Sequence, residues 1–280
     1  MTVKIVTESV SDLPSQAAEE LSITIIPAYI HFGTETYRDG IDMTTEEFYD
    51  KLIHSKTPPS TAAPSPRTFA EAYDKLAEET NEILVITVSH KLSALNEVAL
   101  QAIKLMKRKC RIEVIDSQQG CMAEGLLVIS AAKAAKDGAS LDEVIDITKK
   151  NIFRVVIYFS FDTLEYLKRS GRIGRSQAFL GSMLKVNPLI TLRDGVVEPA
   201  DRTRSRAKAI ERLYDFAMSY SHIEEMGVAN TACPDEAEML VEQLSVIFPK
   251  ERIYRPKMTP VIGTHTGPGL LMVAILGDRG

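Results

Sequence analysis

The sequence of 280 residues predicts an α/β protein with two domains. Residues 82–88 form a continuous apolar run of strand length, typical of a parallel strand that is covered on both faces. Strand and helix patterns alternate through the first half of the chain, as in doubly wound folds. Near residue 150 the pattern changes, because Arg193-Asp194-Gly195 lies between apolar runs and Asp-Gly there predicts an antiparallel hairpin. We therefore expect a doubly wound parallel-sheet domain in residues 1–150 and a mixed-sheet α/β domain in residues 151–280.

The elements of the first half follow from capping residues, proline positions and apolar spacing. Extended segments are predicted at Val3–Thr7, Ile23–Phe32, Glu82–Val88 and Arg111–Ile115. A first helix is predicted to end at Leu21, and a second to extend from a capping box at Thr44 to His54. A third contains Phe69, Tyr73 and Leu76 on one face, and a fourth extends from Ser93 through Met106. Two more are predicted from about Cys121 to Lys136 and from Leu141 onward. A proline-rich loop over residues 57–66 leads into the third of these helices.

In the second half, a strand is predicted at Val155–Phe159, followed by a short helix that Asp162 caps. Ser170–Arg175 is a basic turn, and the predicted hairpin pairs Pro188–Leu192 with Val196–Val197. Near the C-terminus, glycines and prolines surround His265 and predict a tight turn before an apolar run at Leu271–Leu276.

Composition excludes several classes of protein. A hydrophobic content of 45% and a charged content of 25% are those of a globular chain that can bury a core. The net charge of −5 argues against nucleic acid as the main partner. The three cysteines lack metal-ligand spacing and are expected to be reduced thiols in a cytoplasmic protein. We expect neither a secretion signal nor a membrane span, and therefore no integral membrane association.

Familiar catalytic motifs are missing from the sequence. There is no G-x-G-x-x-G, no G-x-S-x-G elbow and no H-E-x-x-H, and the five histidines show no ligand spacing. The glycine spacing of Gly120–Gly125 resembles a P-loop, but the chain continues with Leu126. Nucleotide, metal and serine-hydrolase chemistry are thereby disfavoured, and we expect no cofactor and no catalytic residue.

Hydroxyl side chains stand where loops lead into helices. Thr61 and Ser65 precede one predicted helix, and Ser89 and Ser93 precede another. Free N–H groups and the helix dipole favour an anion at such a place, although each hydroxyl taken alone is more commonly a helix cap. Two such junctions, together with His265, would form an uncharged pocket rich in donors for one carboxylate or phosphate. On the ordinary interpretation His265 is an idle histidine in a turn.

Several charged features allow two interpretations. Asp116-Ser117 is either part of the same polar rim or turn chemistry, and Arg172 and Arg175 either hold an anion or face solvent. The basic cluster Arg202-Thr203-Arg204-Ser205-Arg206-Ala207-Lys208 is either a solvated helix face or a contact surface for an acidic or phosphorylated partner.

Taken together, several motifs resemble the DegV family of bacterial fatty-acid-binding proteins, which includes the FakB subunits of fatty acid kinase. The motifs span nearly the whole chain: Val6–Ser9 with Ser11–Pro14, Ser60–Ser65, Ser89–Ser93, Ile115–Ser117, Asp162–Leu167 with Gly171–Gly174, and Ile262–Gly269. Each motif is modest by itself, but their order and number make the resemblance specific.

The resemblance implies that one long-chain fatty acid, such as palmitate, stearate or oleate, is held between the two domains. Its carboxylate would be bound by Thr61, Ser93 and His265, with the backbone N–H of Ala94 and with Arg172 as further ligand-binding groups. The family is also expected to act as a lipid-binding carrier and not as an enzyme. A separate ATP-dependent kinase subunit would phosphorylate the bound acid, and the acyl phosphate would enter phospholipid synthesis.

The basic segment with Arg202, Arg204 and Arg206 is implied to meet that kinase. Two positions depart from the family pattern, since Leu92-Ser93-Ala94-Leu95 stands where Leu-Ser-Gly-Thr is usual, and Glu8 stands where aspartate is usual. Two other classes of function stay open. One is a self-sufficient phosphotransferase or isomerase acting on a small anion, and the other is a lipid-responsive regulatory module.

Overall fold

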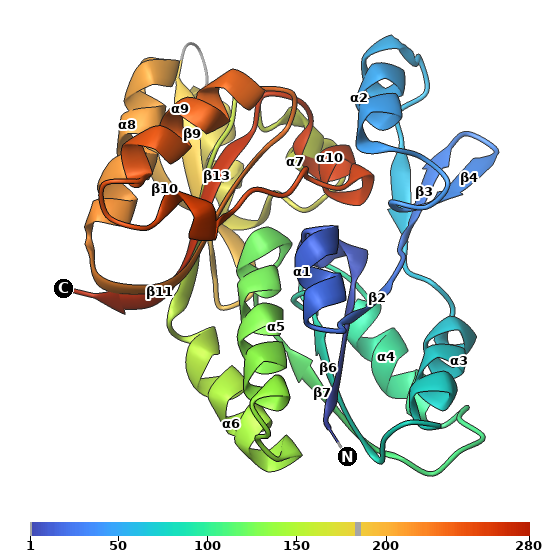
Figure 1. The fold of residues 1–280 in the computed structure, drawn as a ribbon. Helices are drawn as coiled ribbons and strands as arrows, with labels where there is room; N and C mark the ends of the chain where they lie inside the picture. Colours follow the sequence, from blue (N-terminus) through green and yellow to red (C-terminus); the bar gives the residue numbers. More distant parts are fainter. Residues whose placement is uncertain (1, 183–185) are drawn as a thin grey trace.

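The computed structural model describes residues 2–182 and 186–280 and contains two main sheets and one small sheet (Figure 1). The first sheet has the order β2-β1-β6-β7, and all its pairs are parallel. The second has the order β10-β9-β8-β13-β11-β12 and is antiparallel except for its last pair. The third is antiparallel, with the order β4-β3-β5. This confirms the predicted parallel and mixed sheets, while the small sheet was not predicted.

The strands are β1 (Lys4–Glu8), β2 (Thr24–Ile26), β3 (Tyr29–Phe32), β4 (Glu35–Arg38), β5 (Ser60–Ala62), β6 (Glu82–Thr87), β7 (Arg111–Asp116), β8 (Val155–Ser160), β9 (Asn187–Arg193), β10 (Val196–Thr203), β11 (Tyr220–Asn230), β12 (Ile253–Tyr254) and β13 (Leu271–Arg279). The α-helices are α1 (Ser15–Glu20), α2 (Thr45–His54), α3 (Pro66–Leu76), α4 (Leu95–Ile103), α5 (Cys121–Lys136), α6 (Leu141–Ile152), α7 (Glu165–Arg169), α8 (Arg206–Met218), α9 (Pro234–Leu244) and α10 (Pro260–Thr266). The described residues also form the 3₁₀ segments η1 (Ser9–Ser11), η2 (Gly174–Ser182) and η3 (Lys250–Arg252).

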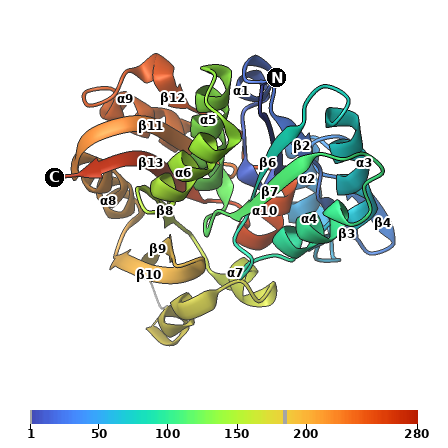
Figure 2. The ribbon, with the colours of Figure 1, turned by 90° about the horizontal axis from the view of Figure 1, so that it is seen from below.

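Helix α5 joins the two main sheets. It contacts β1 and β6 of the parallel sheet and β8, β11 and β13 of the mixed sheet, and it lies between them in Figure 2. Its side chains are buried almost around the whole circumference, as expected for a helix that is apolar on every side. A single apolar core therefore runs from the parallel sheet through α5 to the inner face of the mixed sheet, while α8 and α9 cover a second core on the outer face.

Most predicted elements are present, with local corrections. Helix α2 has the predicted capping box at Thr44, and the hairpin at Asp194-Gly195 turns with positive φ at both residues. The extended segment Ile23–Phe32 is in fact two strands that belong to different sheets. Helix α4 starts at Leu95 and not at Ser93, and Asp162 does not cap α7, whose N-cap residue is Leu164.

The largest correction concerns the segment around His265. The predicted tight turn is present only at Pro268-Gly269, after His265, because Pro260–Thr266 forms the short helix α10, which Gly267 closes at φ 70°. The carboxylates of Asp12 and Asp39 accept the backbone N–H groups of Thr259 (2.8 Å) and Val261 (3.3 Å), which would otherwise be unpaired at the helix start. Helix α10 packs against α2, β3, β5 and α7, so it reaches across to the first half of the chain (Figure 1).

Candidate ligand-binding site

A largely apolar cavity lies between the two main sheets, beside the start of α5. It encloses about 990 Å³ between protein atoms, its open mouth included, which is within the range of sites for small organic ligands. Its apolar lining comes from β8, β9 and β10 of the mixed sheet, from α4, α5, α7 and α10, and from η1 and the loops that follow β6 and β8: Val10, Val88, Leu92, Leu95, Cys121, Phe159, Phe161, Leu167, Ile190, Leu192, Val197, Val261 and Ile262. Such a lining suits a ligand with a long hydrocarbon part.

One end of this cavity is polar, because Thr61 and His265 meet there. The Oγ1 atom of Thr61 lies 2.9 Å from Nε2 of His265, although 204 positions separate them in the sequence. Strand β5 fixes Thr61 by pairing with Ile30 of β3, and the last turn of α10 presents His265. The predicted proline-rich loop thus contains a short strand, and that strand places the hydroxyl.

His265 is held in its neutral form. Burial, followed by the positive charge of Arg172, lowers the pKa of its imidazole to about 4. At neutral pH the ring therefore carries one N–H donor and one acceptor nitrogen. Its buried Nδ1 atom has no hydrogen-bond partner among the residues that the structure describes. Such a ring can exchange hydrogen bonds with Thr61 and with a ligand without placing a second positive charge in the cavity.

Arg172 supplies the positive charge at this end. Its Nη1 donates to the carbonyl of Ser170 (2.6 Å) and its Nε to the carbonyl of Leu92 (3.3 Å). Its side chain is exposed, and within the described ranges both of its hydrogen bonds go to backbone carbonyls and none to a carboxylate. Because these two bonds hold the guanidinium at the cavity wall, the site favours an anionic group.

Ser93 and Ala94 line the same wall, just before α4. The Oγ atom of Ser93 accepts the N–H of Leu95 at 3.4 Å, which leaves its hydroxyl proton available to a ligand. Ala94 is the N-cap residue of α4 and offers no side-chain cap to the first turn. All five residues predicted to bind the ligand, Thr61, Ser93, Ala94, Arg172 and His265, therefore border one cavity.

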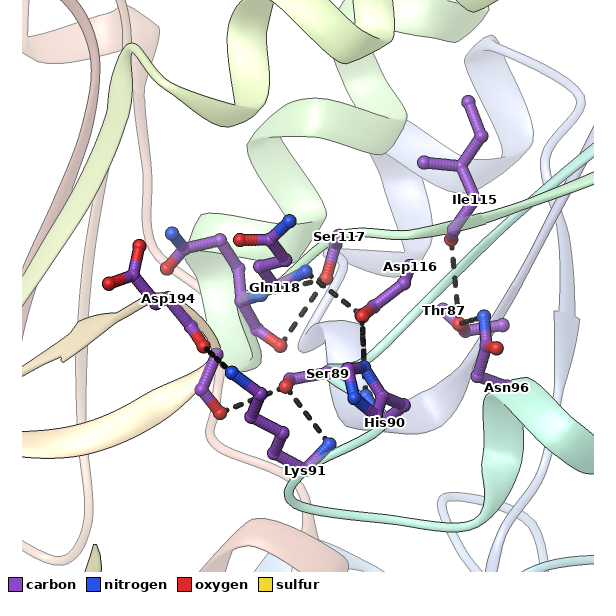
Figure 3. A network of polar contacts seen from close by, with 12 residues as sticks. Thr87, Ser89, His90, Lys91, Asn96, Ile115, Asp116, Ser117, Gln118 and Asp194 are labelled. Atoms are coloured by element: carbon purple, nitrogen blue, oxygen red, sulfur yellow. Dashed lines mark hydrogen bonds and ion pairs between the residues drawn. The ribbon is translucent and has the colours of Figure 1, made fainter.

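Other predicted candidates have structural roles. Ser65 caps α3 by accepting the N–H of Thr68 (3.3 Å), and Ser89 donates to the carbonyl of Gly195 (2.9 Å) across to the β9–β10 hairpin. Asp116 faces His90 and accepts the N–H of Gln118 (3.0 Å), which is turn chemistry and not part of the cavity rim (Figure 3). Lys91 adds to the contact between the Ser89 loop and the β9–β10 hairpin by donating to the carbonyl of Asp194 (2.8 Å) (Figure 3).

Among the other predicted arginines, Arg175 and Arg206 form ion pairs with glutamates, and Arg202 and Arg204 have exposed side chains. Arg175 pairs with Glu198, away from the cavity. Arg206 is half-buried at the start of α8 and pairs with Glu236 at 2.6 Å, so it supports the fold and is not available to a partner in this conformation. The side chains of Arg202 and Arg204 are exposed, on β10 and in the turn before α8.

Residues 2–278 match the sequence model of a protein family that is described as "Uncharacterised protein, DegV family". The chain belongs to the DegV family. A DegV domain-containing protein of Streptomyces coelicolor is 34% identical over 277 residues, which is 98% of each chain. The protein DegV of Bacillus subtilis is 30% identical over 275 residues, covering 97% of this chain and 98% of its own.

Solved DegV structures share the whole fold. A DegV family protein from Thermus thermophilus, described as binding fatty acid, has a TM-score of 0.91 at 31% identity and covers 99% of this chain and 100% of its own. DegV of Bacillus subtilis, described as a fatty acid binding protein, has a TM-score of 0.90 at 29% identity and covers 99% of each chain. In the described part of this DegV chain, no helix is long and apolar enough to cross a bilayer, and no cluster of three metal-ligating side chains is found.

Sequence reasoning missed a group of buried carboxyls under the cavity. Glu8 accepts the N–H groups of Val10 (2.8 Å) and Val88 (2.7 Å), both of which line the cavity. Glu124 on α5 accepts the hydroxyl of Thr7 at 3.1 Å and lies close enough to Glu8 for the two carboxyl groups to interact electrostatically. The position of Glu124 inside an otherwise apolar stretch was the one sequence signal that could have revealed this group.

Burial sets the protonation of this group. It raises the pKa of Glu8 to about 6 and that of Glu124 well above its usual range, where the charge of Glu8 adds to the effect. Burial also raises the pKa of Asp39 to about 6 and that of Asp12 well above its usual range. The carboxyl groups that accept hydrogen bonds from the cavity-lining backbone and from the start of α10 therefore hold their protons more tightly than exposed carboxyl groups do.

Substituting Glu124 with glutamine is expected to stabilise the protein at pH 8 and to change little at pH 5. Since the native state binds the proton of Glu124 more tightly than the unfolded chain, its contribution to stability is greatest below the ordinary carboxyl pKa and is lost as the pH rises toward the raised pKa of the native state. The amide is neutral at every pH, and its oxygen can still accept the hydroxyl of Thr7. We expect the free energy of unfolding at pH 8 to rise by about 2 kcal/mol, measured by urea denaturation. An equal change at both pH values would contradict this explanation.

Proposed function

We propose that this chain binds one long-chain fatty acid, such as palmitate, stearate or oleate, in the cavity between the domains of residues 1–150 and 151–280. The acyl chain occupies the apolar part. The carboxylate lies at the polar end, where Thr61, Ser93, the N–H of Ala94 and His265 donate hydrogen bonds and Arg172 supplies charge. The observation that carries the proposal is the pairing of Thr61 with His265, at 2.9 Å, at one end of an otherwise apolar cavity.

The energetics of the cavity agree with this ligand. Burying one CH₂ group contributes about 0.8 kcal/mol, so an acyl chain of roughly 16 carbons offers on the order of 12 kcal/mol before the costs of binding. A buried carboxylate costs several kcal/mol unless hydrogen bonds and a cation offset its desolvation. The apolar lining therefore supplies the affinity, and the polar end fixes the orientation of the acid.

The proposed role is that of a carrier in the bacterial cytoplasm that hands its ligand to a separate kinase subunit. There, a carboxylate oxygen would attack the γ-phosphorus of ATP held by the kinase, forming the acyl phosphate and releasing ADP, and the product would enter phospholipid synthesis. The open mouth of the cavity and the guanidinium of Arg172 support this role, because the mouth keeps the carboxylate reachable and the positive charge favours its ionised form. The exposed side chains of Arg202 and Arg204 are the proposed contact with the kinase.

Mass spectrometry of the denatured protein tests the proposal. We expect protein purified from bacterial cells fed with palmitate or oleate to release close to one equivalent of fatty acid on extraction. Protein delipidated by mild chromatography should take up one equivalent again. Reproducible absence of fatty acid after feeding, with no uptake by folded delipidated protein, would refute the assignment.

A further inference from the structure

Helix α10 carries His265, but its first turn is held by residues from the other half of the chain. Its N-cap residue, Thr259, makes no side-chain hydrogen bond to the helix. The carboxyl group of Asp12 instead accepts the backbone N–H of Thr259 at 2.8 Å, and that of Asp39 accepts the N–H of Val261 at 3.3 Å. The bonded residues are 247 and 222 positions apart in the sequence. We call Asp12 and Asp39 the carboxyl clamp.

The carboxyl clamp lies in the interior of the protein. Only 1% of Asp12 and 3% of Asp39 is exposed, and Val261 is buried as well. A buried N–H group that loses its acceptor costs free energy, because water does not replace the lost partner. Without the clamp, the first turn of α10 would therefore have to shift until these N–H groups found other acceptors. The clamp thus fixes where α10 begins.

The middle of α10 packs directly against α2. An added Cβ atom at Gly263 would come within 2.6 Å of Phe48 and of the hydroxyl of Tyr49, so no side chain separates the two helices there. His265 follows Val261 by four residues, which is about 6 Å along the axis of an α-helix. Because the helix is this short and this closely packed, a shift of its first turn displaces His265 as well.

The imidazole ring of His265 has little support of its own. Its Nε2 atom lies 2.9 Å from Oγ1 of Thr61, and its Nδ1 atom has no partner among the residues that the structure describes. The position of the ring therefore depends on the backbone of α10. A displacement of roughly 0.7 Å along this contact would lengthen it to about 3.6 Å, where it is no longer a hydrogen bond.

We propose that Asp12 and Asp39 are positioning residues for the ligand carboxylate, because they anchor the first turn of α10 and so hold His265 opposite Thr61. This inference rests on the proposed function, in which Thr61 and His265 bind the head group. Neither member of the clamp is among the residues that line the lipid cavity, so both act through α10. Loss of the clamp is therefore expected to weaken the binding of the carboxylate much more than that of the acyl chain.

Leucine and asparagine at position 39 test the clamp, since both are close to aspartate in size but only asparagine keeps an oxygen that accepts the N–H of Val261. We expect Asp39→Leu to weaken palmitate binding about tenfold, the equivalent of one lost hydrogen bond to the carboxylate. Displacement of a fluorescent fatty acid measures it. The affinity for uncharged methyl palmitate should change less than about threefold. Asp39→Asn should bind both ligands within about twofold of the wild type.

The same comparison applies to Asp12, where the backbone restricts the choice of residue. Its φ is 50°, a conformation that asparagine tolerates well. Asp12→Asn should therefore retain palmitate affinity within about twofold, whereas Asp12→Ala removes the acceptor and should weaken palmitate binding about tenfold. If Asp39→Leu does not fold, this second pair of variants decides the question.

A double-mutant cycle separates positioning from general damage to the cavity. In a His265→Leu background no imidazole remains to be positioned, so adding Asp39→Leu should weaken palmitate binding less than about twofold further. Lys257→Gln is the matched control, because it removes the exposed ion pair of Lys257 with Glu46, which also links the segment before α10 to α2. We expect this control to leave palmitate affinity unchanged.

The possible outcomes distinguish the clamp from the lipid cavity. If the wild type does not bind palmitate, the proposed function itself fails. The clamp is refuted, and the lipid cavity stands, if folded Asp39→Leu binds palmitate as the wild type does or loses affinity for both ligands equally. An undiminished effect of Asp39→Leu in the His265→Leu background would refute it too. A tenfold loss in Asp39→Asn would show that the charge acts instead of the hydrogen bond, which also contradicts the proposal.

Discussion

Replacing both polar groups at the end of the lipid cavity, Thr61→Val with His265→Leu, is expected to weaken palmitate binding by at least about 100-fold. The two side chains are 2.9 Å apart and border the same cavity, so together they supply the donors nearest to the proposed carboxylate. A buried charge that loses its partners costs about 3–5 kcal/mol, and every 1.4 kcal/mol is a factor of ten in the dissociation constant. Displacement of a fluorescent fatty acid measures the change.

Methyl palmitate provides the matched control for this double variant. It has the same chain but no charge, so the loss of hydrogen bonds to the head group costs much less. We expect its affinity to change less than about threefold between the wild type and the double variant. If both ligands lose affinity equally, the variant has damaged the cavity, and the carboxylate does not lie at Thr61 and His265.

Introducing a side chain at Gly125 is expected to lower the stability of the protein strongly. A Cβ atom there would lie 2.6 Å from the backbone carbonyl oxygen of Ser11. That oxygen belongs to η1 and cannot move away without displacing the strand β1 that precedes it. We expect Gly125→Val to lower the free energy of unfolding by about 3 kcal/mol, measured by urea denaturation, because overpacking forces the backbone of α5 to shift.

Ala134→Val is the control on the same helix. Ala134 is half-buried, and valine there costs less than about 1 kcal/mol through helix propensity alone. If the two variants were equally stable, the close contact of α5 with η1 would not constrain the fold. Since Gly120 and Cys121 at the start of α5 line the lipid cavity, Gly125→Val is also expected to lower palmitate uptake.

Elements with strong local signals could be predicted from the sequence. Helix α5 extends from Cys121 to Lys136 as predicted, because its run of alanine and apolar residues has no competing turn signal. The hairpin at Asp194-Gly195 formed as predicted, since both positions adopt the left-handed backbone that this pair tolerates. The residues that line the polar end were also found in advance, through hydroxyls at the starts of helices and through the resemblance to the family.

The segment around His265 was predicted wrongly because its glycines serve packing as well as turning. An added Cβ atom at Gly263 would come within 2.6 Å of both Phe48 and the hydroxyl of Tyr49, so this glycine allows α10 to approach α2. The helix start depends on Asp12, which lies 247 positions from its partner Thr259. Contacts over such sequence distances leave no local signal.

The shape of the cavity could not be predicted for a related reason. The lining of the lipid cavity comes from β-strands of the mixed and small sheets, from α4, α5, α7 and α10 and from the segments between them, and its residues differ little from other core residues. Glu8 and Glu124 lie far apart in the sequence, so their proximity is visible only in the folded protein.

A crystal structure of the protein saturated with palmitate tests the central claim most directly. We predict one palmitate, with its chain in the apolar cavity and its carboxylate oxygens about 2.7–3.0 Å from Oγ1 of Thr61 and from a ring nitrogen of His265. Arg172 should lie close to the same carboxylate. A palmitate bound with its carboxylate away from Thr61 and His265, or a cavity without palmitate in protein that carries one equivalent, would contradict the proposal.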